Sequence, residues 1–435
     1  IFAEEFTSGN PDVVSEEETP EIFTNEELEA AGETDEELSV FSSDEVPEFN
    51  DAPDEAMAAA ENEQAGEIDL ADNDKVMNGV YTIRSAGDHK FTCSRETGNR
   101  IVVDGKGISP KASINIYLNK VNINTSNGPA LQINVNVEAT VTIYLTGTNN
   151  LITKHTWYAG LQKVNTALLI ITTNVSDTTA GILNAHGSSD GDGAGIGGGL
   201  SGSCSNITIE SCSVIASSNY GAGIGGGKQG AGSKITINSA SVTASSTGGA
   251  GIGGGLYGAG SGSDITINSS SVTASSTNGA GIGGGEGNSC ENITINSSSV
   301  TASSTNGAGI GGGYEYGGSC KNITINGGSV KASSVSGSPT NEGKEVYCCT
   351  IENPENANVT IKPGTGSNWK PVNHSSLDPD DTNLYVWLPK LEDNSTKSNY
   401  VITLNQENGS ESRTRNYSFD TVTNTFKAAQ VVNDF

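Results

Sequence analysis

Short runs of alternating hydrophobic and polar residues recur along the middle of the chain. The clearest run, "ITI", stands at 207–209, 235–237, 265–267, 293–295 and 323–325. Each copy is followed by a valine-centred run such as "SVTAS". Alternation with a period of two predicts β-strands that bury one face and expose the other. Gly, Ser and Asn separate the runs, so we expect short strands joined by turns.

A glycine-rich string, "GAGIGGG", recurs with the same period as these strands. Its isoleucine falls at 196, 224, 252, 282 and 310, so successive copies are 28, 28, 30 and 28 residues apart. A fixed period of this length is typical of a solenoid, in which each coil buries its apolar face only against its neighbours. A phosphate-binding loop would need Gly-Lys-Ser/Thr followed by a helix, and no copy of the string continues in that way.

These patterns predict an all-β protein, a right-handed parallel β-helix with coils of about 28 residues. Each strand pairs with its copy one coil away, and the isoleucine of "GAGIGGG" points into the tube. Earlier coils at 113–133, 141–162 and 168–199 repeat the same order of strands with bulkier residues. The glycines form one wall of the coil, where the backbone bends sharply or approaches its neighbours closely.

Composition divides the chain into unequal parts. Residues 1–74 contain 26 Asp or Glu and no Lys or Arg, which leaves 51 − 26 = 25 acidic against 22 basic residues elsewhere. The net charge of −29 therefore belongs to a tail, and it argues against nucleic acid as a partner. We expect four parts: an acidic disordered spacer (1–76), an N-terminal β cap with the first strands (77–112), the parallel β-helix (113–345), and C-terminal strands or a cap (346–435).

The string "ITIN…SVTAS…GAGIGGG", preceded by "GVYTI" and "RIVVDG", resembles secreted or cell-surface β-helix proteins of anaerobic Gram-positive bacteria. Those proteins are often described as carbohydrate-binding. The chain is also similar, more loosely, to a clostridial β-helix family that binds acidic plant polysaccharide with calcium. The resemblance covers residues from about 79 to 340 and implies the fold more strongly than the ligand.

Loops of variable sequence follow each glycine string, and we expect them to form a ridge along one corner of the tube. Variation on a constant scaffold indicates where recognition takes place. Tyr257, Tyr314 and Tyr316 lie in these loops, and Trp157, Tyr158 and Tyr220 lie at a second corner before the glycine wall. Exposed aromatic rings can stack on sugars, so these six residues are the candidate ligand-binding residues; the alternative is that they are scattered surface residues.

Two aspartates in "SSDGDGAG", Asp190 and Asp192, are the candidate metal ligands. Alternating carboxylates in a glycine loop could bind calcium, and the alternative is an ordinary Asp-Gly turn. No motif indicates a catalytic pair, so no residue is assigned a catalytic role. A polysaccharide lyase usually needs a Lys or Arg base, and the chain has no arginine between Arg100 and Arg413.

The chain has seven cysteines, so at least one is unpaired or bonds another chain. Cys290 and Cys320 precede "ENITI" and "KNITI" in successive coils, and one coil step of about 4.8 Å suits a disulfide. Cys204 occupies the same place three coils earlier and is too distant to join them. Cys212 is predicted to be a buried free thiol.

We expect a secreted or cell-surface protein that is a monomer and that binds a glycan or mediates adhesion without catalysis. The opening "IFA" resembles the end of a secretory signal, and no stretch of the chain is long and apolar enough to span a membrane. A structural surface stalk and a polysaccharide-degrading lyase or hydrolase are the alternatives.

Overall fold

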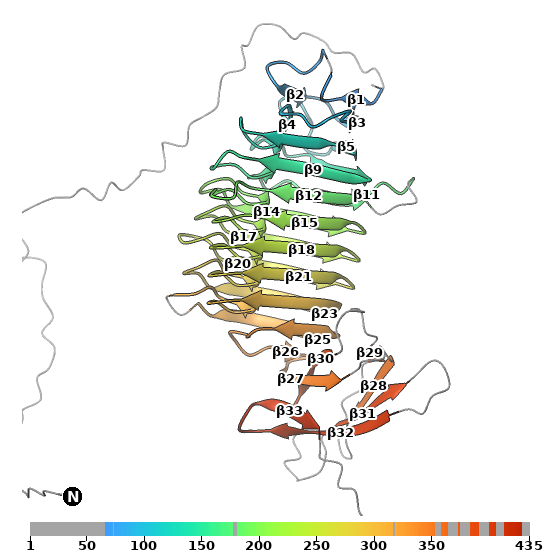
Figure 1. The fold of residues 1–435 in the computed structure, drawn as a ribbon, viewed down its shortest axis with the longest axis vertical. Coiled ribbons are helices and arrows are strands. Elements are labelled where there is room, and N and C mark those ends of the chain that lie inside the picture. The colour runs from blue at the N-terminus through green and yellow to red at the C-terminus, as the bar shows by residue number, and fades with distance from the viewer. Residues whose placement is uncertain are drawn as a thin grey trace, which may run out of the picture. The chain divides into compact units, whose positions relative to one another are not determined.

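The computed structural model describes residues 66–72, 74–176, 181–315, 318–352, 358–363, 373–374, 383–390, 400–405 and 413–428. Residues 1–65, which include most of the expected acidic spacer, lie outside the described residues. Every regular element in the described part is a β-strand. Figure 1 shows these strands stacked in successive coils from β1 (Ile68–Asp69) to β25 (Cys320–Ala332).

Two faces of each coil carry the strands that the alternating runs predict. Face 1 consists of β1, β3 (Gly87–Thr92), β5 (Ser113–Asn119), β8 (Thr140–Thr146), β11 (Leu169–Thr173), β14 (Cys204–Glu210), β17 (Gly232–Asn238) and β20 (Gly262–Asn268). Face 2 consists of β6 (Asn122–Thr125), β9 (Thr148–Thr153), β12 (Ile182–His186), β15 (Ser213–Ser217), β18 (Ser241–Ser246) and β21 (Ser271–Ser276). The long strands β23 (Cys290–Ser304) and β25 continue both ladders.

Within the described residues, face 3 contains nine short strands that form one ladder. They are β2 (Val80–Ile83), β4 (Arg100–Val103), β7 (Leu131–Ile133), β10 (Leu161–Lys163), β13 (Ile196–Gly197), β16 (Ile224–Gly225), β19 (Ile252–Gly253), β22 (Ile282–Gly283) and β24 (Ile310–Gly311). All pairings within the three ladders are parallel, for example Leu161 with both Leu131 and Ile196. The predicted parallel β-helix is therefore confirmed.

The core of the tube is a set of isoleucine columns. Ile207, Ile235 and Ile265 lie in register on face 1, and each is fully buried. Ile252 and its copies on face 3 are fully buried as well. Between the inward residues, Thr236 and Asn238 face outward, as the period of two predicts. Fully burying an isoleucine contributes roughly 1.5–3 kcal/mol, so stability grows with each added coil.

The glycine string passes very close to its copies in neighbouring coils. At Gly253, φ is +135°, and a Cβ atom there would lie 2.0 Å from the carbonyl oxygen of Gly283. The string also folds back on itself, because the N–H of Ala250 donates to the carbonyl of Gly254 at 2.8 Å. Only glycine fits a backbone packed this closely, which explains why the string repeats almost without side chains.

The folded part begins earlier than composition suggests. β1, which lies in the segment assigned to the spacer, pairs with β3 through Ile68 and Phe91. Leu70 is fully buried and Ile68 nearly so. These two apolar residues cover the inward side chains of the first coil, because the end of a solenoid core would otherwise face water. The acidic composition of the surrounding sequence hides this short apolar run.

The C-terminal part is a mostly antiparallel unit built from β26 (Thr340–Asn341), β27 (Lys344–Glu352), β28 (Asn358–Pro363), β29 (Asn373–His374), β30 (Asn383–Pro389), β31 (Tyr400–Asn405), β32 (Arg413–Asp420) and β33 (Thr425–Ala428). It has its own core around Tyr400 and Phe426. The indole N–H of Trp387 donates to the carbonyl of Val330 at 2.9 Å. β30 thus lies against β25, the last strand of the coil stack.

Candidate functional site

Two columns of loops meet at the corner where the glycine string enters and leaves the coil. The column before the string contains residues 156–158, 191–192, 219–220, 247–248 and 277–278, and the column after it contains 200–203, 228–231, 256–261, 286–289 and 314–315. Together they are called the ridge. At five successive levels, a residue of the second column donates its N–H to a carbonyl of the first column one coil earlier. The pairs are Leu200–Trp157, Lys228–Asp192, Leu256–Tyr220, Glu286–Gly248 and Tyr314–Asn278.

This connection corrects the placement of the candidate aromatic residues. The sequence puts Trp157, Tyr158 and Tyr220 at one corner and Tyr257 and Tyr314 at another. In the structure both groups lie on the ridge, because the glycine string contributes a strand of face 3 and also folds back on itself. Backbone hydrogen bonds of 2.7 Å and 2.9 Å connect the two columns at Leu200–Trp157 and Leu256–Tyr220.

The ridge exposes a succession of large aromatic side chains. Trp157, Tyr220, Tyr257 and Tyr314 are 49, 37, 43 and 48% exposed, which leaves a large part of each side chain open to a ligand. Tyr158 is half-buried. Tyr316 lies outside the described residues.

Charged groups accompany the rings at one level of the ridge. Lys228 Nζ lies 3.1 Å from Asp192 Oδ1 and 5.1 Å from the centre of the Tyr220 ring. The lysine therefore connects a carboxylate in one coil with an aromatic ring in the next. Since the ion pair is partly exposed, it contributes at most about 1 kcal/mol to stability and can rearrange when a polar ligand arrives.

A buried carboxylate positions the polar groups at another level. Glu286 is nearly buried, and its Oε1 accepts a hydrogen bond of 3.1 Å from the hydroxyl of Tyr257. Its Oε2 accepts a bond of 2.9 Å from Asn278 Nδ2. Asn306 in turn donates to Asn278 at 2.8 Å. This network fixes the Tyr257 side chain, so its exposed ring loses little conformational entropy when a ligand binds.

The N-terminal end of the ridge carries a cluster of three aromatic rings. The ring centre of His155 lies 5.6 Å from that of Trp157 and 4.5 Å from that of Tyr158. His155 Nδ1 also accepts the N–H of Trp157 at 3.2 Å. Trp157 therefore projects from a loop whose conformation is held by local contacts.

The two candidate calcium ligands have different surroundings. Asp190 is exposed and accepts a hydrogen bond of 2.8 Å from the Ser188 hydroxyl, whereas Asp192 pairs with Lys228. Within the described ranges, no three His, Cys, Asp or Glu side chains gather into a group that could hold a metal ion. Calcium binding at this loop stays a prediction from the sequence pattern alone.

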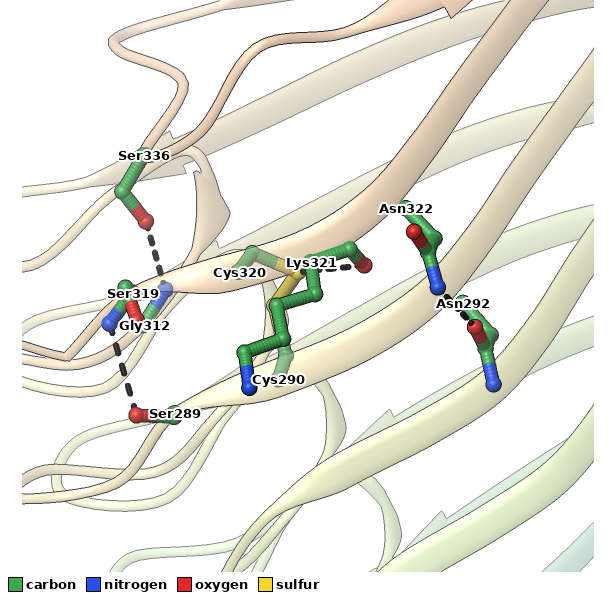
Figure 2. Close-up of a disulfide and its surroundings, with 9 residues drawn as sticks. All are labelled: Ser289, Cys290, Asn292, Gly312, Ser319, Cys320, Lys321, Asn322 and Ser336. Carbon is green, nitrogen blue, oxygen red and sulfur yellow. Dashed lines mark hydrogen bonds between the residues drawn. A yellow bond between two sulfur atoms is a disulfide. The ribbon is translucent and has the colours of Figure 1, made fainter.

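A disulfide joins Cys290 and Cys320, the pair expected from the coil register, with their Cα atoms 4.5 Å apart. Figure 2 shows the disulfide and, further along the same two strands, Asn292 and Asn322, whose side chains are hydrogen-bonded: Asn322 Nδ2 donates to Asn292 Oδ1 at 2.9 Å.

Cys204 and Cys212 are free and buried. Burial raises the pKa of Cys204 to about 11 and that of Cys212 to about 12.

Sequence reasoning did not identify Lys228, Glu286 or Asn278 as parts of the ridge. Each stands next to a glycine string, and the residues around it in the sequence form no recognisable motif. Only the contacts between neighbouring coils identify them as parts of the ridge. The repeat gives one signal that these residues share a position: Lys228, Glu286 and Tyr314 all stand directly after "GGG".

Comparison with known families supports the coil assignment. A family model described as "Beta helix repeat" matches residues 235–256, 265–286, 293–314 and 323–338. The matches start at Ile235, Ile265, Ile293 and Ile323, which lie in register on face 1. This part of the chain is therefore similar to β-helix repeats. Searches of curated proteins and of solved structures gave no match.

None of the described segments forms an apolar helix long enough to cross a membrane.

Proposed function

We propose that this chain is a non-catalytic glycan-binding protein that works outside the cell, as a secreted or surface-attached monomer. The observation that carries the proposal is the ridge, where Trp157, Tyr220, Tyr257 and Tyr314 are exposed along one line of loops. Sugar rings have apolar faces that stack on aromatic side chains and hydroxyls that bond amides and carboxylates.

The ridge suits an extended chain better than a single sugar. Its loops repeat once per coil, at steps of about 4.8 Å, and aromatic residues occur at several of these steps. The polar groups between the rings include Lys228, Asp192 and Asn278. A linear glycan lying along the ridge would meet rings and hydrogen-bonding groups in alternation.

An extracellular location is supported by the disulfide between Cys290 and Cys320. Structural disulfides persist in oxidising compartments and are rare in the cytosol. The glycan ligand would then be a component of a cell envelope, a host surface or plant material.

A glycan array probed with the full chain tests the proposal. We expect binding to one class of linear glycan, and each of Trp157→Ala, Tyr220→Ala and Tyr314→Ala should weaken it by about 1–2 kcal/mol, roughly ten-fold. Ile215→Ala is a matched control, because Ile215 is an exposed residue on face 2.

Three results would contradict the proposal. Binding that survives all three ridge substitutions, in variants whose melting temperature is unchanged, would place the site elsewhere. Binding to no glycan at all would favour a purely structural stalk. Release of reducing ends or unsaturated products from a bound polysaccharide would instead show an enzyme.

A further inference from the structure

A second candidate binding site lies on face 1, in the first coils of the tube. A hollow of about 460 Å³ opens there, lined among others by Glu67, Asp88, Lys90, Tyr117 and Asn119. Its volume lies within the range of small-ligand pockets. The hollow is lined by residues of β3, β5 and β8, by the residue before β1 and by two residues after β11, and none of them belongs to the ridge.

Tyr117, which lines this hollow, belongs to a pair of stacked tyrosines. Tyr117 and Tyr144 lie in register on β5 and β8. Their rings are stacked, with centres 4.7 Å apart and an angle of 14° between the planes. Tyr144 thus covers one face of the Tyr117 ring. The other face is directed toward β3, which pairs with β5 on the opposite side from β8.

Lys90 lies in register with Tyr117 and partly covers this second face. Its Nζ atom is 5.8 Å from the centre of the ring, on an exposed and flexible side chain. A ligand can therefore take the place of the lysine over the ring while the ammonium group moves to its edge. The Tyr144 ring behind Tyr117 keeps the stacking surface in place.

Two carboxylates, Glu67 and Asp88, line the hollow, and each accepts a hydrogen bond from an amide. Asn115 Nδ2 donates to Asp88 Oδ1 at 2.7 Å, and Asn119 Nδ2 donates to Glu67 Oε1 at 2.8 Å. Each carboxylate has a second oxygen that can accept further hydrogen bonds. The hollow thus offers fixed acceptors in Glu67 and Asp88 and a mobile donor in Lys90.

This combination matches the chemistry of a pyranose. A sugar ring has an apolar face for stacking, and its hydroxyls donate and accept hydrogen bonds at the same time. Two carboxylates against one ammonium give the hollow a net negative charge, which disfavours an anionic sugar. We propose that the hollow binds one uncharged pyranose unit, stacked on Tyr117 and hydrogen-bonded by Asp88, Glu67 and Lys90. This site is separate from the ridge and does not depend on glycan binding there.

The test is saturation-transfer NMR on the full chain with methyl glycosides of glucose, galactose, mannose and N-acetylglucosamine. We expect saturation transfer to at least one of them and none to methyl glucuronide. Tyr117→Leu should weaken binding at least ten-fold, while Tyr117→Phe, which keeps the ring, should retain most of it. Asp88→Ala should also weaken binding, and because Asp88 is exposed, this variant remains informative if Tyr117→Leu fails to fold.

Tyr257→Ala on the ridge is the matched control and should leave this binding unchanged, which separates the hollow from the ridge. The proposal is overturned if none of the four neutral glycosides receives saturation. It is also overturned if both Tyr117→Leu and Asp88→Ala, with unchanged melting temperatures, bind as well as the wild type.

Discussion

The N–H of Leu256 donates to the carbonyl of Tyr220 at 2.9 Å, although 36 residues separate them in the chain. Leu256 follows one glycine string and Tyr220 precedes the string of the coil before. The bond shows how the string returns to the corner from which it started. It also determines the surface of the protein, because it places two sets of variable loops on one ridge.

The inward and outward assignment of face 3 and face 1 can be tested by two substitutions. Ile252→Asp would place an unpaired charge in the tube and should lower the free energy of unfolding by several kcal/mol. Thr266→Ser alters an outward position and should change it by less than about 0.5 kcal/mol. Urea denaturation monitored by circular dichroism gives both values. Equal tolerance of the two changes would contradict the observed register.

The start of the folded part predicts how truncation affects stability. Removing residues 1–65 leaves β1 intact and should not change the melting temperature. Removing residues 1–74 also deletes the buried Ile68 and Leu70, which should cost about 3–6 kcal/mol from lost apolar burial. Calorimetry on both truncated proteins measures the difference. If the two melt at the same temperature, β1 does not contribute to the core.

The disulfide predicts a loss of stability when it is removed. Cys320→Ser should lower the free energy of unfolding by about 2–4 kcal/mol, because the bond closes a loop of 30 residues in the unfolded chain. Mass spectrometry of the oxidised protein should find Cys290 and Cys320 in one linked peptide. Cys93→Ser, at a free cysteine that is only partly buried, is the control and should have a small effect. A linked peptide of Cys204 and Cys290 would contradict the coil register.

The buried thiols predict low reactivity and a defined dependence on pH. Burial raises the pKa of Cys204 to about 11, so the folded protein keeps this thiol protonated at pH 8. Iodoacetamide should label Cys204 and Cys212 slowly in the native protein and rapidly in urea. In the unfolded chain the thiols ionise above about pH 8.5, so the unfolded state binds fewer protons than the folded state and stability falls as pH rises through this range. Rapid native labelling of either residue would show that it is accessible.

The polar ladder on face 1 predicts an effect that depends on position. Asn296 donates to Asn268 at 2.8 Å, and Asn326 donates to Asn296 at 2.8 Å. Asn296→Ala removes both bonds and should destabilise the protein by about 1–3 kcal/mol, because each such bond contributes about 0.5–1.5 kcal/mol. Asn326→Ala removes only the bond to Asn296 and should cost about half as much. Chemical denaturation measures the ratio, and equal losses would show that the ladder is not additive.

The sequence by itself determined the coil. A period of about 28 residues, alternation in "ITI" and "SVTAS", and a recurring glycine string together predict parallel stacking of copies. The inward isoleucines, the register of Cys290 with Cys320 and the buried state of Cys212 follow from that period alone, since every coil repeats the same geometry.

Tertiary structure decided what the coil presents to a ligand. A string of glycines has no alternation of apolar and polar side chains from which its path could be predicted. The sequence therefore does not show that the string folds back and brings two corners together in the ridge. The short apolar run of Ile68 and Leu70 is hidden in acidic sequence, and its burial depends on the exposed end of the core. Tyr117 and Tyr144 are ordinary outward residues of two strands, and only the stacking of coils makes them a pair with a hollow beside it.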